Sequence, residues 1–218
     1  MIAAHQTMMG PQKTWPVPQY TGVTLVGSSV QNNNGILSGF TTSSYATMPW
    51  RMTAGATSLE AVIRFHWNGV NSSNQGIWGC VGSKNSFTPF YYESVSNNPN
   101  HLFGSYISSN GTSWTVATFQ GYWDPQYPAA GDYTLKLVWS GGTLYYQRWT
   151  GTSWNTDRTW SISSIYGDAN LVPQLGTNRG QNNPLNGTID LNYTYLMRDG
   201  QLLWEGTPGA YKRVAQLT

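Results

Sequence analysis

Charge is what this sequence has least of. Only 9% of its 218 residues are Asp, Glu, Lys or Arg, whereas an average soluble domain carries about a quarter. The formal net charge is +2, and the chain contains no run of basic residues. Proteins that bind phosphate backbones or anionic membranes use such runs, so we expect neither nucleic acid nor membrane insertion. The surface must instead be covered mostly by Asn, Ser, Thr, Gly and Gln.

Cysteine and long apolar runs are also scarce. The single cysteine, Cys80, excludes a disulfide framework within one chain, and its glycine and apolar neighbours predict a small buried side chain rather than a reactive thiol. No apolar stretch approaches the roughly 20 residues that span a bilayer. The N-terminus lacks an early positive charge followed by an apolar segment, so we expect no secretory signal peptide.

Aromatic residues, in contrast, are abundant. The 11 Trp and 14 Tyr argue against disorder. Apolar residues alternate with polar ones over 59–67 and again over 133–139, the pattern of strands with one buried face. Clusters of Asn, Ser, Gly and Pro separate such segments about every 8 to 12 residues, and no window keeps a helical period. The sequence therefore predicts an all-β fold, an antiparallel sandwich of two sheets.

The C-terminal segment 184–206 has the clearest pattern. Asp199-Gly200 suits a two-residue turn of the primed type, so the segment predicts a β-hairpin. On strict alternation, the inward face of its first strand would carry Ile189, Leu191, Tyr193, Tyr195 and Met197. Residues 1–20 are irregular and rich in proline, which predicts an N-terminal arm followed by a single domain over 21–218.

Three segments resemble the concanavalin A-like lectin/glucanase superfamily, in particular the laminin-G-like jelly rolls of phage tail and fibre proteins. They are NNNGILSGFTTSSYATMPW, TSLEAVIRFHWNGVNSSNQGIWG and the closing hairpin PLNGTIDLNYTYLMRDGQLLWEG, which has Leu185 where Phe is commoner. The resemblance covers most of residues 22–206. It implies two curved sheets packed face to face, but this fold carries lectins, hydrolases and spacer modules alike, so function must be argued from sites.

Carboxylates suited to catalysis are scarce. Hydrolases of the superfamily usually take their acids from a Glu-x-Asp-x-x-Glu strand motif, and this chain has no such motif and only three Glu. Glu60 is interpreted as a charge partner of Arg64 on the same strand face. Asp190 is followed on its face by Asn192, so Glu60 and Asp190 remain only an atypical acid pair. We expect no catalysis and no cofactor. Calcium stays open as a weaker alternative, with Asp190-Leu-Asn192 or Asp168-Ala-Asn170 as ligands.

Aromatic and amide side chains in loops are the better candidates for ligand binding, because sugars are bound by aromatic faces and planar polar groups. A Gly-Thr-Ser-Trp sequence occurs at residues 111–114 and 151–154, and both copies are interpreted as hairpin tips. The loops 121–128 and 178–183 are rich in aromatic and in amide side chains, respectively. The predicted ligand-binding residues are Trp114, Tyr122, Trp123, Asp124, Tyr127, Trp154, Asn178 and Arg179. For the aromatics, the competing interpretation is packing over the edge of the core, and for 178–183 it is a solvated turn.

The first functional hypothesis is a non-catalytic receptor-binding domain of a phage fibre or tail-associated virion protein. In this hypothesis the domain binds a host surface glycan, forms a homotrimer and contacts other virion proteins through the N-terminal arm. "Phage" and "trimer" come from the resemblance alone. The alternatives are a structural head fibre or decoration protein without a specific ligand, and a glycan hydrolase with an atypical carboxylate pair.

Overall fold

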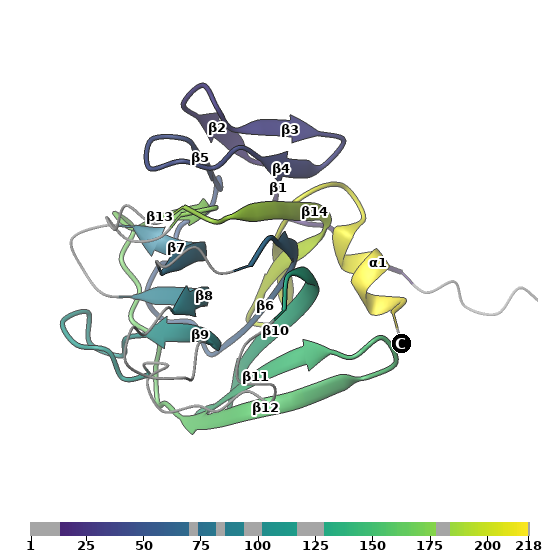
Figure 1. Ribbon diagram of the computed structural model, residues 1–218. Helices are drawn as coiled ribbons and strands as arrows, with labels where there is room; N and C mark the ends of the chain where they lie inside the picture. The colour runs from purple at the N-terminus through teal and green to yellow at the C-terminus, as the bar shows by residue number, and fades with distance from the viewer. Residues whose placement is uncertain are drawn as a thin grey trace, which may run out of the picture.

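Two sheets pack face to face in the computed structural model (Figure 1), which describes residues 14–69, 74–81, 86–93, 102–116, 129–177 and 184–217. The larger sheet contains β1 (Tyr20–Thr21), β3 (Gln31–Asn33), β4 (Ile36–Ser38), β6 (Ser58–Trp67), β10 (Gly131–Ser140), β11 (Thr143–Trp149), β12 (Trp154–Ser161), β14 (Gly187–Arg198) and β15 (Gln201–Glu205). The smaller sheet contains β2 (Thr24–Val26), β5 (Tyr45–Thr47), β7 (Gln75–Val81), β8 (Phe87–Glu93), β9 (Leu102–Ile107) and β13 (Val172–Leu175). The all-β sandwich predicted from the sequence is confirmed.

The order of the strands across each sheet differs from their order in the sequence. The larger sheet runs β1-β15-β14-β6-β10-β11-β12, with β4 pairing with β14 and β3 with β4; the smaller runs β2-β5-β13-β7-β8-β9. The first pair, β1 with β15, is parallel, and it places Tyr20 opposite Trp204. This pairing brings the start of the described chain beside its end.

The core lies between the two sheets and is built largely from aromatic rings. Trp78 of β7 contacts Trp50, Phe90 and Trp204, with ring centroids 6.3, 5.9 and 5.6 Å away. Because Trp204 belongs to β15 of the larger sheet, these contacts join the two sheets directly. The predicted inward faces of 59–67 and 133–139 are confirmed, with Tyr133 only partly buried at the edge of the core.

Alternation fails inside β14. Between two cross-strand pairs, Asp190 with Arg64 and Tyr195 with Val62, β14 advances five residues while β6 advances two, a bulge of three extra residues. An odd insertion reverses the face of every later side chain. The prediction of one continuous inward face is therefore wrong. The early residues Ile189 and Leu191 lie in the central core, whereas the later ones, Tyr193, Tyr195 and Met197, lie in a second cluster on the outer face of the sheet.

The helix α1 (Ala210–Ala215) covers this second cluster (Figure 1). At six residues it is too short to be stable alone. The carboxylate of Glu205 accepts hydrogen bonds from the backbone N–H groups of Gly209 (2.9 Å) and Tyr211 (3.4 Å), which satisfies donors that the first turn leaves unpaired. Val214 then packs on Val62 and Tyr195. Within the described residues, no helix is long and apolar enough to cross a membrane.

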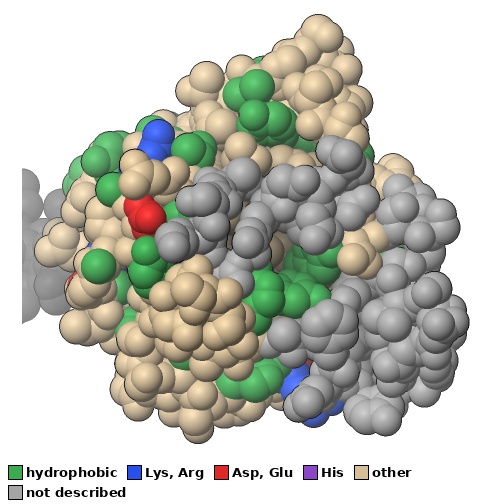
Figure 2. Space-filling model, turned by 90° about the vertical axis from the view of Figure 1, so that its left-hand side faces the viewer, with side chains coloured by type: hydrophobic (Ala, Val, Ile, Leu, Met, Phe, Trp, Pro, Cys, Tyr) green, Lys and Arg blue, Asp and Glu red, His purple; other side chains and the backbone are tan. Residues whose placement is uncertain are grey.

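Few charged side chains appear on the face of the molecule that includes the smaller sheet (Figure 2). Those that the picture shows among the described residues are scattered between uncharged polar and apolar groups. Cys80 of β7 belongs to the central core, at 2% exposure. Burial raises the pKa of its thiol well above the ordinary value, although the positive charge of Arg51 acts in the opposite direction. The prediction of a buried, unreactive thiol is thus supported by its surroundings.

Candidate functional site

Most of the residues predicted to bind ligand lie outside the described part of the chain. These are Tyr122, Trp123, Asp124 and Tyr127 of the first loop and Asn178 and Arg179 of the second. Their role stays a prediction. Trp114 and Trp154 are described, and each lies next to a turn, as expected from the repeated Gly-Thr-Ser-Trp sequence.

Trp154 begins β12 directly after the β11–β12 turn and is half-buried. Its ring lies 5.5 Å from that of its cross-strand partner Trp149. The Nζ of Lys136 lies 4.1 Å from the ring centroid, a cation–π contact. Burial lowers the pKa of Lys136, and the nearby negative charge of Glu60 opposes this shift. Trp154 also packs against the second cluster. Trp154 therefore packs on the outer face of the larger sheet, and its role in ligand binding stays a prediction.

Trp114 follows a turn after β9. Asn110 organises that turn by accepting, through Oδ1, hydrogen bonds from the backbone N–H groups of Thr112 (2.9 Å) and Ser113 (3.0 Å). The Trp114 ring lies 5.4 Å from that of Tyr106. In Figure 1 this turn and the β11–β12 turn point to opposite sides of the molecule. The two turns that precede the predicted tryptophans therefore lie on different sides of the molecule.

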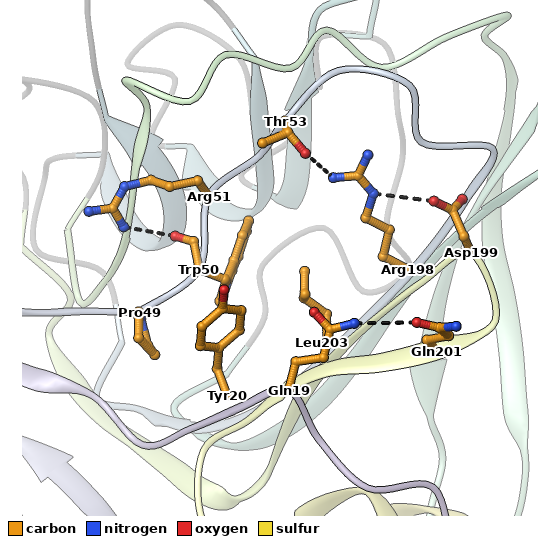
Figure 3. A pocket seen from close by; sticks show the side chains of 10 residues that line it. All are labelled: Gln19, Tyr20, Pro49, Trp50, Arg51, Thr53, Arg198, Asp199, Gln201 and Leu203. Atoms are coloured by element: carbon orange, nitrogen blue, oxygen red, sulfur yellow. Dashed lines mark hydrogen bonds and ion pairs between the residues drawn. The ribbon is translucent and has the colours of Figure 1, made fainter.

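A cleft of about 440 Å³ lies elsewhere, at the edge where β1 meets β15 (Figure 3). Three separate segments form it: residues 19–20, residues 49–53 after β5, and the β14–β15 turn with the start of β15. The backbone N–H of Gln19 donates to the carbonyl of Leu202 (3.1 Å), which fixes the first segment to the third. We name this site the edge cleft. Its lining residues are Gln19, Tyr20, Pro49, Trp50, Arg51, Thr53, Arg198, Asp199, Gln201 and Leu203.

The apolar part of the edge cleft is a partly exposed aromatic surface. Tyr20 keeps 42% of its surface exposed, whereas Trp50 beside it is 1% exposed. The segment 48–52 alternates, with Met48, Trp50 and Met52 directed into the core, so that Pro49 is left on the solvent side. An exposed ring backed by buried apolar side chains is suited to contact the C–H face of a sugar.

The turn at Asp199-Gly200 forms the polar wall of the edge cleft. Both residues have positive φ, 51° and 76°, which confirms the predicted primed turn. Arg198 reaches across the cleft to donate through Nη1 to Thr53 Oγ1 (2.5 Å) and through Nη2 to the carbonyl of Ala54 (2.9 Å). Its Nε donates to Asp199 Oδ2 (3.3 Å). This arginine therefore fixes one wall of the cleft to the other.

Asp199 is held as an anion by its neighbours. Partial desolvation acts to raise the pKa of its carboxyl group, but hydrogen bonds from Thr57, Ser58 and Arg198 outweigh it and lower the pKa to about 2. Asp199 Oδ1 accepts from the Thr57 N–H (2.6 Å) and hydroxyl (2.7 Å) and from the Ser58 N–H (3.0 Å). A carboxylate so occupied is a fixed part of the wall and is poorly suited to transfer protons.

Two amides lie at the rim. Gln19 Nε2 donates to Gln201 Oε1 (3.3 Å) across the β1–β15 pair. Arg51 donates through Nη1 to the carbonyls of Trp50 (2.8 Å) and Met48 (3.3 Å). In Figure 3 the guanidinium group of Arg51 points away from the other lining side chains.

The two acids considered for catalysis lie apart. Asp190 pairs with Arg64, four residues along β6 from Glu60, so their backbone positions are separated by roughly 13 Å at 3.3 Å per residue. Glycosidases place their acids about 5 to 5.5 Å or about 6.5 to 9.5 Å apart. Glu60 accepts a hydrogen bond from the hydroxyl of Tyr195. Its predicted pairing with Arg64 is wrong, because the guanidinium of Arg64 lies over the Tyr193 ring, 4.7 Å from its centroid.

The oxygen atoms considered for calcium have structural partners. Asp168 Oδ1 accepts from the backbone N–H (2.8 Å) and side-chain amide (2.9 Å) of Asn170, an Asx turn. Asp190 Oδ1 accepts from the backbone N–H of Asn192 (3.0 Å). No group of three or more His, Cys, Asp or Glu side chains that could hold a metal ion occurs in the part of the chain that the structure describes.

The edge cleft was not predicted from the sequence. Its residues come from three segments that are distant along the chain and carry no motif. Only the parallel pairing of β1 with β15 brings residues 19–20 to the hairpin turn. The available signal was weak: Asp199-Gly200 marked the turn, and Tyr20 was a single aromatic in a region assigned to the arm.

Solved structures with the same fold include carbohydrate-associated and phage proteins. Domain 4 of AbnA, a GH43 extracellular arabinanase from Geobacillus stearothermophilus solved in complex with arabinotriose, aligns with a TM-score of 0.51 at 14% identity, over 87% of this chain and 82% of that one. The enzymatically active domain of tailspike protein 2 from bacteriophage CBA120 aligns at 0.55 and 10% identity, over 95% of this chain and 32% of that one. Full-length tailspike protein 2 from an Escherichia coli O157:H7 bacteriophage gives 0.56 at 10% identity, over 97% and 29%.

These similarities support the fold, a sandwich of two antiparallel-rich sheets of the jelly-roll kind. The chain spans about a third of the length of the tailspike chains that it matches. No family model matches the sequence, and no curated protein matches it in sequence.

Proposed function

We propose that this chain is a non-catalytic carbohydrate-binding domain of a phage fibre or tail-associated virion protein, and that it binds a glycan of the host surface. The observation that carries the proposal is the edge cleft, in which the exposed ring of Tyr20 stands beside amide side chains. An aromatic face combined with a few planar hydrogen-bonding groups is the composition of a saccharide site.

The solved structures support the choice of ligand class and of setting. One neighbour is a domain solved with a bound oligosaccharide, and two are phage tailspike chains. The low charge and the polar, uncharged surface suit a protein that contacts glycans rather than nucleic acid. The laminin-G-like resemblance of 22–206 adds the virion setting and the homotrimer. In this proposal, the part of the N-terminal arm that precedes Gln19 and Tyr20 attaches the domain to other virion proteins, because these two residues line the edge cleft.

A binding role fits the carboxylates better than hydrolysis does. Among the described residues that line the edge cleft, Asp199 is the one acid, and its oxygens are occupied by hydrogen bonds. The backbones of Glu60 and Asp190 lie roughly 13 Å apart along the strands, and each carboxylate accepts a hydrogen bond from a neighbouring residue, an arrangement that favours a structural role for both acids. The scarcity of Glu in the whole sequence points the same way.

A glycan array with the purified full chain tests the proposal, run beside a reducing-end assay on the same glycans. We expect saturable binding to one glycan class without new reducing ends. Tyr20→Ala should abolish that binding, because it removes the exposed ring. Tyr145→Ala is the matched control, since Tyr145 is exposed to a similar degree, 37%, but lies on β11 outside the cleft.

Each contrary result has a distinct meaning. Released reducing ends would make the protein a hydrolase. Absence of binding even at high surface density, where several copies act together, would favour a structural virion protein. Binding that survives Tyr20→Ala but is lost in a Trp123→Ala/Tyr127→Ala double variant would move the site to the loop 121–128.

A further inference from the structure

The amide pair at the rim of the edge cleft has unused hydrogen-bonding capacity. An amide side chain offers one carbonyl and one NH₂ group. The contact between Gln19 Nε2 and Gln201 Oε1 uses the donor side of one amide and the acceptor side of the other. The carbonyl of Gln19 and the NH₂ of Gln201 have no other partner among the described residues. If both amides were flipped, the same two kinds of group would remain, on exchanged residues.

A free acceptor and a free donor, held side by side, match two neighbouring hydroxyl groups. Each hydroxyl can donate one hydrogen bond and accept another. One sugar hydroxyl would donate to the carbonyl of Gln19, and the adjacent hydroxyl would accept from the NH₂ of Gln201. The ring of Tyr20, next to Gln19 in the chain, supplies the apolar surface for the sugar C–H face.

In the wall of the edge cleft, the charge of Arg198 is balanced by that of Asp199. Arg198 and Asp199 form an ion pair, and every nitrogen of the guanidinium group of Arg198 donates to a protein acceptor. Arg51 also lines the cleft, but its guanidinium group points away from the other lining side chains and donates to the carbonyls of Met48 and Trp50 (Figure 3). A carboxylate placed against Gln19 and Gln201 would lose water without a free cation beside it, which is unfavourable.

We infer that the edge cleft selects an uncharged saccharide with two free vicinal hydroxyl groups, and that Gln19 and Gln201 recognise this pair. The inference rests on the proposed function, because it assigns the ligand class to the same site. It makes Gln19 and Gln201 specificity-determining residues.

The test measures binding of immobilised full chain to arabinotriose, maltotriose and cellotriose, to their O-methylated forms, and to trigalacturonic acid. We expect at least one neutral trisaccharide to bind, and O-methylation to weaken it by about tenfold or more, because methylation removes the O–H group that donates to Gln19 and its methyl group crowds the oxygen that accepts from Gln201. Trigalacturonic acid should bind more weakly than the neutral sugar. Gln201→Leu should weaken the neutral sugar by about tenfold. Gln147→Leu is the control, because Gln147 lies on β11 away from the cleft.

The possible outcomes distinguish a failure of this inference from a failure of the proposed function. Unchanged binding in Gln201→Leu together with loss in Tyr20→Ala would overturn the inference and leave the carbohydrate site in place. Preference for trigalacturonic acid, weakened by salt, would overturn the uncharged ligand class. Binding that neither Tyr20→Ala nor Gln201→Leu affects would overturn the edge cleft as the site. Absence of binding to every probe here would overturn the inference, whereas the glycan array decides the proposed function separately.

Discussion

At the scale of single residues, Asp199 connects the hairpin turn to the segment that precedes β6. Its carboxylate accepts three hydrogen bonds from Thr57 and Ser58, and it ion-pairs with Arg198. These contacts lower the pKa of Asp199 from 3.8 to about 2. Because the folded pKa is depressed, its contribution to stability is fully present above about pH 4 and is lost as the pH falls to about 2.

The variant Asp199→Asn tests this contribution, since Asn also tolerates the positive φ of the turn. Because 38% of the Asp199 side chain is exposed, solvent screens its interactions. We therefore expect a loss of about 1 kcal/mol of unfolding free energy at pH 7, less than the full pKa shift would correspond to. Urea unfolding at pH 7, 4, 3 and 2 measures it. The difference from the unmodified protein should shrink toward pH 2. A difference that stays constant with pH would show that the charge of Asp199 does not contribute.

Cys80 provides a second residue-scale prediction. Burial in β7 raises the pKa of the thiol, the effect of Arg51 being smaller, so that the reactive thiolate is suppressed in the folded state. Thiol labelling with Ellman's reagent at pH 8 should therefore proceed only as fast as the protein opens. The labelling rate should rise with urea in parallel with unfolding. Rapid labelling without denaturant would mean that the Cys80 region opens independently.

At the scale of elements, the bulge in β14 depends on Thr194. This side chain is completely buried; its hydroxyl donates to the carbonyl of Asp190 (2.7 Å) and accepts from the backbone N–H of Arg64 (3.4 Å). Thr194→Val keeps the shape and removes both bonds. We expect a loss of about 1 to 3 kcal/mol in urea unfolding, because two backbone groups lose their partner.

Thr188→Val is the matched control, since Thr188 lies on the same strand and is only half-buried. It should change the unfolding free energy by less than about 0.5 kcal/mol. Equal effects of the two substitutions would show that the hydroxyl of Thr194 does not hold the bulge.

The bulge in β14 could not be predicted from the sequence, although the faces of the regular strands could. Strict alternation predicted the inward faces of 59–67 and 133–139 correctly, because the two strands pair with each other without a bulge. In β14 the residues Ile189 and Tyr195 both look like core positions, and nothing in their spacing reveals the insertion between them. The edge cleft was missed for a related reason. Its walls meet only after β1 pairs with β15, and these two strands lie near opposite ends of the sequence.

At the scale of the whole molecule, the aromatic core makes the two sheets one cooperative unit. Trp78 of the smaller sheet contacts Trp204 of the larger sheet, as well as Trp50 and Phe90. A sheet that lost this contact would expose a large apolar face to water. The two sheets should therefore unfold together, and a change at Trp78 should weaken both.

Urea unfolding followed by far-UV circular dichroism and by tryptophan fluorescence tests this coupling, and the two curves should coincide. Trp78→Ala should lower the unfolding free energy by about 3 to 5 kcal/mol in both signals, because it leaves a large cavity at the junction of the sheets. The exposed control Tyr145→Ala should change it by less than about 0.5 kcal/mol. Separate transitions, or a Trp78→Ala effect in one signal alone, would show that the sheets unfold independently and that Trp78 does not couple them.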